Sequence, residues 1–154
     1  MSFEADTLIV GASAAGLATA RCLKKAGQSF EIAEAADVVG NAWRHHYDRL
    51  HLHTPKSSSA LPGLKMPREW PRYPDRVQVV DYLKQYCARQ GLAPHYDAEV
   101  TRLELVDGTW TATTRTRQWR ARNVVVATGA ARRPVRPTWP GMDSYRGQLL
   151  HSSQ

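Results

Sequence analysis

The stretch Leu8–Cys22, LIVGASAAGLATARC, constrains the fold of this chain more than any other. Thr7–Val10 is a short β-rich run typical of a buried strand, and Ala14–Ala26 has the composition of a helix. A second short strand is expected over Ser29–Ala33, directly before Glu34. The order strand, glycine turn, helix, strand is the start of a βαβ unit with a parallel sheet.

The apolar run after Thr7 also has two simpler interpretations, a secretion signal and an ordinary buried helix. A secretion signal requires a basic start, whereas Glu4 and Asp6 precede the run and the first basic residue is Arg21. A buried helix of small residues explains the run about as well as a nucleotide-binding loop does when the run is taken alone. The residues that follow it decide between the two.

The loop reads Gly11-Ala-Ser13-Ala-Ala-Gly16, a G-x-G-x-x-G pattern with serine in the middle position. The first glycine makes the tight turn, the middle residue lets a pyrophosphate approach the backbone, and the last glycine lets helix and strand pack closely. The amides of Ser13, Ala14 and Ala15 would lie at the helix N-terminus, where the helix dipole favours an anion.

Glu34 strengthens this interpretation because it lies 23 residues beyond Gly11, at the end of the second expected strand. The dinucleotide-binding fold places a carboxylate about 20 residues after the loop, where it accepts hydrogen bonds from the ribose hydroxyls. A glutamate there also disfavours a 2′-phosphate, because the two negative charges repel. The sequence therefore predicts a nucleotide loop.

The rest of the chain supplies a second helix and a β-rich region. Thr54–Pro74 contains five prolines but many apolar residues, so we expect a long loop packed on the surface. Asp75 and Gln78 form a capping box for a helix that ends near Gly91. An Asp-Gly hairpin turn follows, then a strand up to Arg122 and a separate apolar strand, Asn123–Ala127. These elements predict an α/β, Rossmann-like domain over residues 1–154, with a parallel sheet and an inserted antiparallel β-meander.

Composition narrows the class of partner. The 154 residues suffice for one domain, and no apolar run is long enough to cross a membrane. The two cysteines form no short-spaced pair, which predicts a reducing, cytoplasmic location. The net charge of +7 would suit nucleic acid, a membrane or phosphate ligands, but no nucleic-acid motif accompanies the basic segment Arg115–Arg122. We expect that segment to be a solvated strand face, with neither nucleic acid nor membrane as partner.

Four histidines, His45, His46, His51 and His53, invite a metal site. No cysteine or paired acid nearby completes a set of ligands, so we expect no metal.

Four segments, in order, resemble the N-terminal FAD-binding region of the flavin-containing monooxygenases, which are class B flavoprotein monooxygenases. They are GASAAGLATA, EAADVVGNAWRHHYDRLHLHTPK, VVVATG and YRGQLLHSS, and the resemblance covers essentially the whole chain. The last segment follows the family pattern F-x-G-x-x-x-H, with Tyr145 in place of phenylalanine. Asn41 replaces the second glycine of the family pattern GGxW.

The resemblance implies a set of FAD contacts. The glycine loop would hold the pyrophosphate, Glu34 and its neighbour the adenosine ribose, and the backbone of Val100 the adenine. The GNAW segment and the LHT segment would border the flavin, and ATG would mark the crossing between two nucleotide domains. The implied residues are Gly11, Ser13, Ala14, Ala15, Gly16, Glu34, Ala35, Asn41, Trp43, Arg44, Leu52, His53, Thr54, Val100, Ala127, Thr128 and Gly129.

The resemblance also implies an activity for the intact enzyme. NAD(P)H would reduce FAD, and the reduced flavin would react with O₂ to a C4a-hydroperoxyflavin that oxygenates a small soft nucleophile, an amine or a sulfide. No residue of this chain is assigned as a general acid or base. Two alternatives stay open: a truncated, non-catalytic FAD- or dinucleotide-binding module, and another flavoprotein oxidoreductase with two dinucleotide domains.

Pyridine-nucleotide disulfide reductases share the glycine loop, the late acid and the ATG strand, but their chemistry needs two nearby cysteines. No cysteine occurs between Glu34 and Tyr86, so that class is excluded for this stretch. The NAD(P)H-binding domain of the family fold is expected to be absent from residues 1–154. For such a truncated, inactive FAD domain we expect FAD to be lost or held only weakly and the sheet edge beside the first strands to be unpaired. We also expect either self-association into a homo-oligomer or partial disorder near 132–154.

Overall fold

The computed structural model describes residues 2–129 and 134–151 of the chain. Its elements are, in order, β1 (Ser2–Val10), α1 (Ala14–Lys25), β2 (Phe30–Ala33), α2 (Asn41–Arg44), α3 (Lys56–Ser59), α4 (Arg76–Arg89), β3 (Arg102–Val106), β4 (Thr109–Thr113), β5 (Gln118–Val126) and the 3₁₀ turn η1 (Met142–Ser144).

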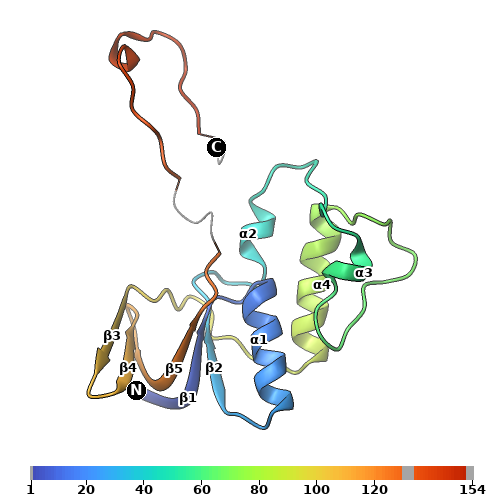
Figure 1. Cartoon of the computed structure of the whole chain (residues 1–154), viewed down its shortest axis with the longest axis vertical. Coiled ribbons are helices and arrows are strands. Elements are labelled where there is room, and N and C mark those ends of the chain that lie inside the picture. The colour runs from blue at the N-terminus through green and yellow to red at the C-terminus, as the bar shows by residue number, and fades with distance from the viewer. Residues whose placement is uncertain (1, 130–133, 152–154) are drawn as a thin grey trace.

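The strands form one sheet in the order β2-β1-β5-β4-β3 (Figure 1). β1 lies parallel to both β2 and β5, whereas β3, β4 and β5 are antiparallel neighbours. The expected combination of a parallel sheet and an antiparallel meander is therefore confirmed. Because β5 belongs to both parts, the meander is a direct extension of the parallel sheet.

The expected division of residues 118–127 into two strands is wrong. β5 is one strand, Gln118–Val126, and β1 likewise begins at Ser2 rather than at Thr7. The first half of β5 alternates exposed and buried residues, with Trp119 and Ala121 buried, and its second half is the apolar run. The change of pattern reflects a change of neighbour, because only the first half pairs with β4 while the whole strand pairs with β1.

The sheet edges are β2 and β3, and β1 is paired along both sides. The outer side of β2, where an unpaired edge is expected, is covered at one point. His95 forms a parallel bridge with Ala33, donating its N–H to the Ile32 oxygen (2.8 Å) and accepting the N–H of Glu34 (2.9 Å).

Alternate residues of β1 face two apolar clusters. Ile9 lies in the main core, together with Leu17 of α1, Ile32 of β2 and Leu83 of α4. A smaller cluster contains the buried apolar residues Leu8, Val10, Ala33, Ala98, Ala112, Trp119 and Ala121. In Figure 1, α1 and α4 lie side by side, away from the β3–β4 end of the sheet. The helices thus cover the β2–β1 part and leave the meander beside it.

Local hydrogen bonds define the end of α1 and the start of α4. Gly27 follows α1 in a left-handed conformation (φ +70°), with the N–H of Gln28 bonded to the Leu23 oxygen (3.0 Å). At the start of α4, the Asp75 carboxylate accepts the Gln78 N–H (2.8 Å), and the Gln78 side chain accepts the Asp75 N–H (3.0 Å). The capping box is therefore confirmed.

The proline-rich segment 54–74 is packed on α4, as expected, although it also contains the short helix α3. Tyr82 donates its hydroxyl to the Leu64 oxygen (2.6 Å) and accepts the Leu61 N–H (2.7 Å), and Tyr86 donates to the Pro62 oxygen (2.6 Å). We call residues 54–74 the strap, because it is tied to α4 by these two tyrosines.

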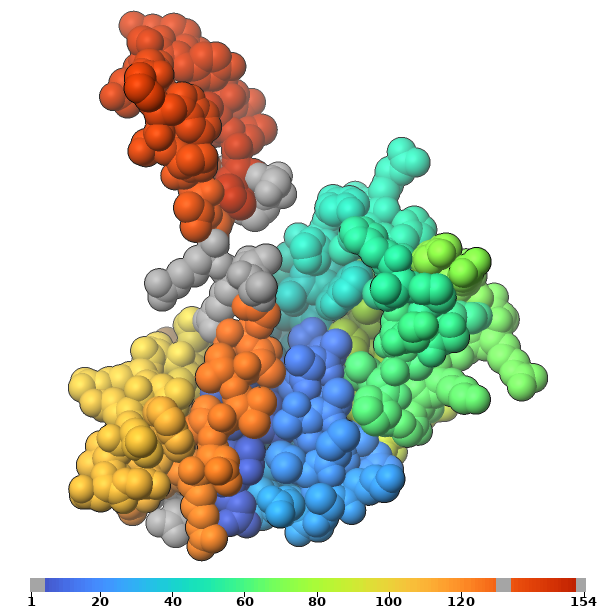
Figure 2. Space-filling view, in the orientation of Figure 1, coloured from blue at the N-terminus to red at the C-terminus, as the bar shows by residue number. Residues whose placement is uncertain are grey.

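Residues 134–151 extend away from the sheet and helices (Figure 2). All of them are exposed except Met142 and His151, which are half-buried. The disorder expected over 132–154 falls partly on residues 132, 133 and 152–154, which lie outside the described residues. Within the described ranges, no helix is long and apolar enough to cross a membrane.

Candidate functional site

The segments that follow β1, β2 and β5 meet at one edge of the sheet. The Gly11 N–H donates to the Ala33 oxygen at the end of β2 (2.8 Å), and the Ala127 N–H donates to the Val10 oxygen at the end of β1 (2.8 Å). Open parallel sheets bind ligands outside the carboxyl ends of their strands. The glycine loop, Glu34 and the ATG segment are therefore brought together where such a ligand would lie.

Two glycines of the loop cannot carry a side chain. Gly11 has φ +111°, and a Cβ there would lie 2.5 Å from the Ala127 oxygen. A Cβ on Gly16 would lie 1.9 Å from the Gly11 oxygen and 3.4 Å from a methyl carbon of Ile9. The first glycine thus brings the loop against β5, and the last lets α1 pack on the loop.

Ser13 is the N-cap residue of α1, but its side chain makes no capping hydrogen bond. The first amides of a helix have no acceptor within the helix. The Ser13 hydroxyl and the amides of Ala14 and Ala15 are therefore available to an anion, and Ala15 is exposed. This geometry suits the predicted pyrophosphate position.

Glu34 is bonded directly to the glycine loop. One carboxylate oxygen accepts the Ala12 N–H (2.6 Å) and the other accepts the Ala36 N–H (2.9 Å). The side chain is half-buried, and Ala35 beside it is exposed. The spacing predicted that Glu34 would lie near the loop, but no sequence signal predicted that its carboxylate would hold the loop itself.

Gly40 is a residue that the sequence analysis missed. Its N–H donates to the Ala12 oxygen (3.1 Å), so the loop is held from this side as well. Its φ is +69°, and a Cβ would lie 2.9 Å from the Leu83 Cδ1 of α4. The signal available was its position at the start of the GNAW segment, where a glycine precedes a short helix.

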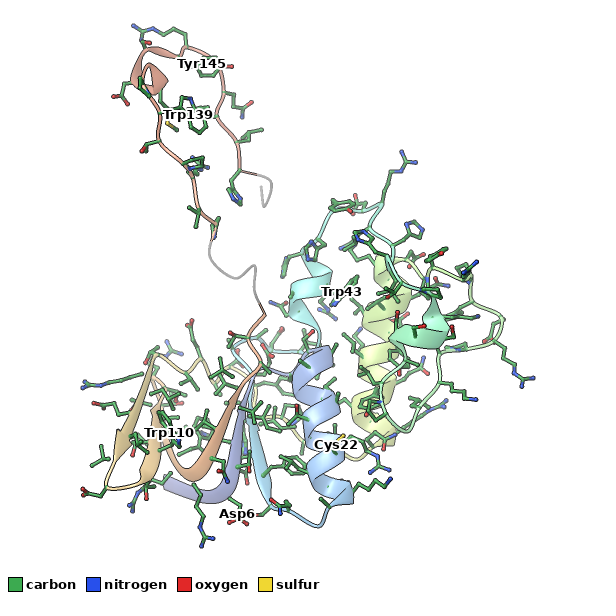
Figure 3. The ribbon with its side chains drawn as sticks, in the orientation of Figure 1. Asp6, Cys22, Trp43, Trp110, Trp139 and Tyr145 are labelled. Carbon is green, nitrogen blue, oxygen red and sulfur yellow. The ribbon has the colours of Figure 1, made fainter. Side chains whose placement is uncertain are left out.

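α2 places the predicted flavin neighbours on the α4 side of the loop. Trp43 is half-buried against the main core and lies between α2 and α4 (Figure 3). The Asn41 side-chain oxygen contacts the His45 Nε2 (3.1 Å), and the Arg44 backbone oxygen accepts a hydrogen bond from Arg76 of α4. Asn41 and Arg44 thus fix α2 itself.

Leu52 and His53 directly precede the strap, and Thr54 is its first residue. The Leu52 N–H donates to the Pro74 oxygen (2.8 Å), and its side chain packs on the main core. His53 and Thr54 are exposed, and the Thr54 hydroxyl is bonded to that of Ser59 (2.7 Å). The hydrogen bonds of Leu52 and Thr54 thus go to residues of the strap and not to the glycine loop.

The remaining predicted residues flank Glu34 and Gly11. Val100 is half-buried against the smaller cluster, two residues after Ala98, whose N–H donates to the Glu34 oxygen (2.8 Å). Thr128 is half-buried, and Gly129 is exposed with φ +83°. Of the predicted set, the structure thus brings the glycine loop, Glu34, Ala127 and their direct neighbours into one place.

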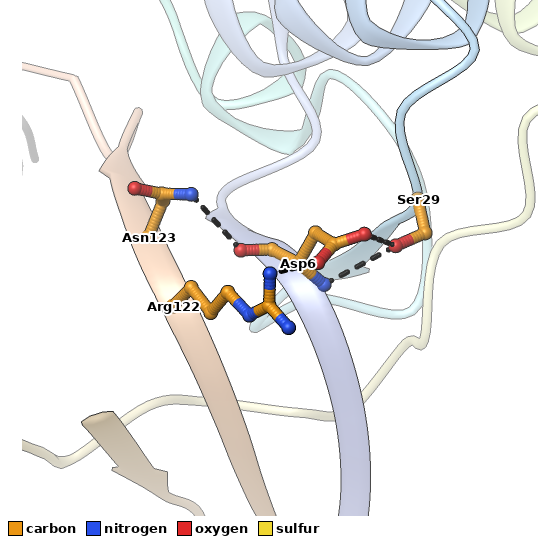
Figure 4. Close-up of polar contacts among 4 residues, drawn as sticks. All are labelled: Asp6, Ser29, Arg122 and Asn123. Carbon is orange, nitrogen blue, oxygen red and sulfur yellow. Dashed lines mark hydrogen bonds and ion pairs between the residues drawn. The ribbon is translucent and has the colours of Figure 1, made fainter. Parts of the chain in front are cut away.

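Two open hollows of the described surface lie away from the glycine loop. One is lined by residues of α2 and α4, among them Arg44, Arg76 and Lys84. The other lies near the amino end of β2. There Asp6 accepts hydrogen bonds from Ser29 and Asn123 and forms an ion pair with Arg122 (3.7 Å; Figure 4).

The basic segment is not uniformly solvated. Arg115, Arg120 and Arg122 are exposed, as expected for a solvated face. Arg117 is half-buried, and its guanidinium lies over the ring of Trp119, 5.5 Å from the centroid. The expectation is therefore wrong for Arg117, because a buried aromatic side chain on the neighbouring strand offers it a packing surface.

Among the described residues, no group of three or more His, Cys, Asp and Glu side chains could hold a metal ion. Cys22 is exposed on α1, Cys87 is buried on α4, and both are free thiols. Burial raises the pKa of the Cys87 thiol, which makes that sulfur a poor nucleophile.

In the last segment, the Tyr145 ring lies so close to Gly147 that a Cβ on the glycine would lie 2.1 Å from the phenol oxygen.

Comparisons with known proteins show similarity to flavin monooxygenases. The chain is 39% identical to the indole-3-pyruvate monooxygenase YUCCA1 of rice over 151 residues, which are 96% of this chain and 37% of that protein. It is 34% identical to an uncharacterised CzcO-like oxidoreductase of Geobacillus kaustophilus, covering all of this chain and 44% of the other. The structure of a flavin-containing monooxygenase from Stenotrophomonas maltophilia matches with a TM-score of 0.92 and 33% identity, over 98% of this chain and 46% of that one.

The chain therefore spans less than half the length of these relatives, and the resemblance to flavin monooxygenases is confirmed. A family model described as pyridine nucleotide-disulphide oxidoreductase matches residues 8–154. The exclusion of that class from the sequence is therefore wrong: the absence of a cysteine between Glu34 and Tyr86 excludes dithiol chemistry from this stretch but does not exclude the family. The chain belongs to the pyridine nucleotide-disulphide oxidoreductase family.

Proposed function

We propose that residues 1–154 form the FAD-binding part of an NAD(P)H-dependent flavin monooxygenase. The observation that carries the proposal is the meeting of the glycine loop, Glu34 and the end of β5 at one sheet edge, with the Glu34 carboxylate 2.6 Å from a loop amide. The similarity to a flavin-containing monooxygenase structure over nearly the whole chain supports it.

The residues present fit the adenosine diphosphate half of FAD. The places where a Cβ of Gly11 or Gly16 would collide are the close approaches that a dinucleotide loop needs. The Ser13 hydroxyl and the first amides of α1 would hold the pyrophosphate. Each Glu34 oxygen has a second lone pair beyond its bond to a backbone amide, and these would accept the ribose hydroxyls.

In the flavin half, Trp43, Leu52, His53 and Thr54 are proposed to form one wall of the site. Bound FAD would supply the redox chemistry, taking a hydride from NAD(P)H and passing oxygen from O₂ to a small-molecule substrate. The side chains of this chain would bind and orient the cofactor, and Trp43 would exclude water from one side of it. None of them is assigned a proton-transfer role.

The substrate class stays a prediction. The motif resemblance favours soft nucleophiles such as amines and sulfides, whereas the rice relative is named for indole-3-pyruvate, a 2-oxo acid. Assays of the full-length enzyme with a tertiary amine, a thioether and an aromatic 2-oxo acid distinguish these classes. A cytoplasmic location is likewise a proposal, supported by the two free thiols.

The proposed cofactor is tested with Glu34 variants. In a full-length protein, Glu34→Lys is expected to abolish retention of FAD, because the cation would repel the loop amides and offer no acceptor to the ribose. Glu34→Gln is expected to weaken FAD binding at least tenfold, because its NH₂ group would face a backbone N–H. Glu104→Gln, at an exposed ion pair with Arg102, is the matched control. Unchanged FAD content in Glu34→Lys would overturn the proposal.

A further inference from the structure

We propose that His95 is a positioning residue for Glu34 and, through it, for the adenosine half of FAD. The second part rests on the proposed function, whereas the first concerns the unliganded chain. His95 lies 61 residues beyond Glu34 and outside every motif that the sequence analysis used.

The backbone of Glu34 is held from both sides by the segment that His95 begins. The Glu34 N–H donates to the His95 oxygen (2.9 Å), and the Glu34 oxygen accepts the Ala98 N–H (2.8 Å). β2 has a neighbouring strand, β1, on one side only, and these two bonds take the place of a strand on the other side. The direction of the Glu34 side chain therefore depends on where residues 95–98 lie.

The side chain of His95 fixes that segment to the sheet. Its Nε2 lies 2.5 Å from a carboxylate oxygen of Glu31 on β2, and its Nδ1 lies 3.0 Å from an Nη of Arg117 in the turn before β5. A guanidinium only donates hydrogen bonds, so Nδ1 accepts. The proton is therefore on Nε2, which donates to Glu31. His95 thus joins three parts of the chain in one defined orientation.

This connection is supported by the core. The His95 ring is tilted against the ring of Trp119 with centroids 5.7 Å apart, and the Arg117 guanidinium lies over the same ring. Trp119 is fully buried in the smaller cluster, together with Ala33, the residue before Glu34. Because a fully buried aromatic side chain is held rigidly by its neighbours, Trp119 fixes the orientation of the His95 ring and thereby the position of residues 95–98.

The consequence lies at the loop. In a chain without the His95 side chain, the bonds to Glu31 and Arg117 are lost, so residues 95–98 separate from β2 and the backbone of Glu34 is freed. The carboxylate would then leave the Ala12 N–H, which it now meets at 2.6 Å. His95→Ala should therefore expose the amides of Ala12 and Ala36 and weaken the site for the adenosine half of the ligand.

The first experiment is amide hydrogen exchange of the unliganded chain, followed by NMR. In His95→Ala, exchange of the Ala12 and Ala36 amides is expected to accelerate about tenfold. The Leu83 amide in α4 is expected to change less than twofold, which distinguishes positioning from general loosening. His51→Ala is the matched control, because this histidine is exposed and its described side-chain hydrogen bond goes to the nearby Arg49 oxygen. Equal acceleration at all three amides, or none, would overturn the proposal.

The second experiment measures ligand affinity with ADP, FAD and FMN. His95→Ala is expected to raise Kd for ADP and FAD about tenfold and to leave Kd for FMN within twofold. His95→Gln, which can still donate to Glu31, is expected to recover most of that loss. A loss that is equal for ADP and FMN would overturn the positioning role. If the unaltered chain binds none of the three ligands, the proposed function fails, and the exchange experiment still decides the link between His95 and Glu34.

Discussion

Glycines of similar appearance in the sequence differ in what the fold requires of them. Gly16 sits where a Cβ would lie 1.9 Å from the backbone oxygen of Gly11, whereas Gly108, in the turn between β3 and β4, has no atom within 4 Å of that position. Gly108 needs glycine only for its left-handed conformation (φ +73°). The loop glycine thus serves close packing, and the hairpin glycine serves the turn.

Gly16→Ala is therefore expected to cost about 2 to 3 kcal/mol of unfolding free energy, because backbone rather than a flexible side chain must move. Gly108→Ala is expected to cost about 1 kcal/mol, since only the strained conformation is involved. Urea unfolding followed by circular dichroism measures both. Equal losses in the two variants would contradict the packing that we assign to Gly16.

At the scale of the elements, the strap is held by a lysine as well as by tyrosines. The Lys56 Nζ donates to the backbone oxygens of Pro67 (2.9 Å), Arg68 (2.7 Å) and Trp70, and the Lys56 N–H donates to the Arg72 oxygen (2.8 Å). One ammonium group thus binds three carbonyl groups from the second half of the strap. Composition alone predicts a packed strap, but it does not predict which side chain organises it.

Lys56→Met is expected to lower the unfolding free energy by about 2 kcal/mol, because three carbonyl oxygens lose their donor and two of these bonds are partly buried. It is also expected to expose the strap to limited proteolysis, which mass spectrometry of the first cleavage products can locate. Lys65→Met, at an exposed lysine of the same strap, is the control. Cleavage that begins outside residues 54–74 would contradict the role of Lys56.

The two tyrosines of α4 make the packing of the strap sensitive to high pH. Burial raises the pKa of Tyr86 from 10.0 to about 12 and also raises the pKa of Tyr82. The unfolded chain therefore loses these protons before the folded chain does as pH rises. The stabilisation is fully present below pH 10 and is lost as pH rises from 10 towards 12.

Each pKa unit corresponds to about 1.4 kcal/mol, so Tyr86 is expected to contribute about 2 to 3 kcal/mol to this loss. In Tyr86→Phe, the decline of stability between pH 10 and 12 should be shallower by that amount. Tyr47→Phe, at an exposed tyrosine, should leave the decline unchanged. Thermal unfolding across this pH range measures the slopes, and parallel slopes for Tyr86→Phe and the unaltered chain would contradict the assignment.

At the scale of the whole molecule, local signals predict most of the framework. The βαβ start, the capping box at Asp75 and the meander each depend on residues close together in the sequence. The contacts of Gly40, His95 and Arg117 do not, because their partners lie 22 to 64 residues away or on another element. The same limit explains why the sequence predicts two strands where β5 is one, since the continuous course of β5 depends on its pairing with β1.

The segment 134–151 presents large apolar side chains to solvent. Val135 is 76% exposed, Leu150 65%, Tyr145 57% and Trp139 54%. Because exposed apolar groups of this size promote association, the chain is expected to self-associate as its concentration rises. Trp139→Glu with Leu150→Glu should shift sedimentation-velocity profiles towards the monomer, whereas Val126→Glu, on β5, should not relieve association. A concentration-independent monomer in the unaltered chain would contradict this expectation.

The pairing of β1 with β5 joins residues 2–10 to residues 118–126. During synthesis the glycine loop, α1 and Glu34 are complete while β1 still lacks one of its two neighbouring strands. At typical elongation rates, the wait for β5 is on the order of ten seconds. Ala127, which closes the loop from behind, arrives only then. The proposed nucleotide site is thus expected to be completed late on the ribosome, although its motif is the first to be made.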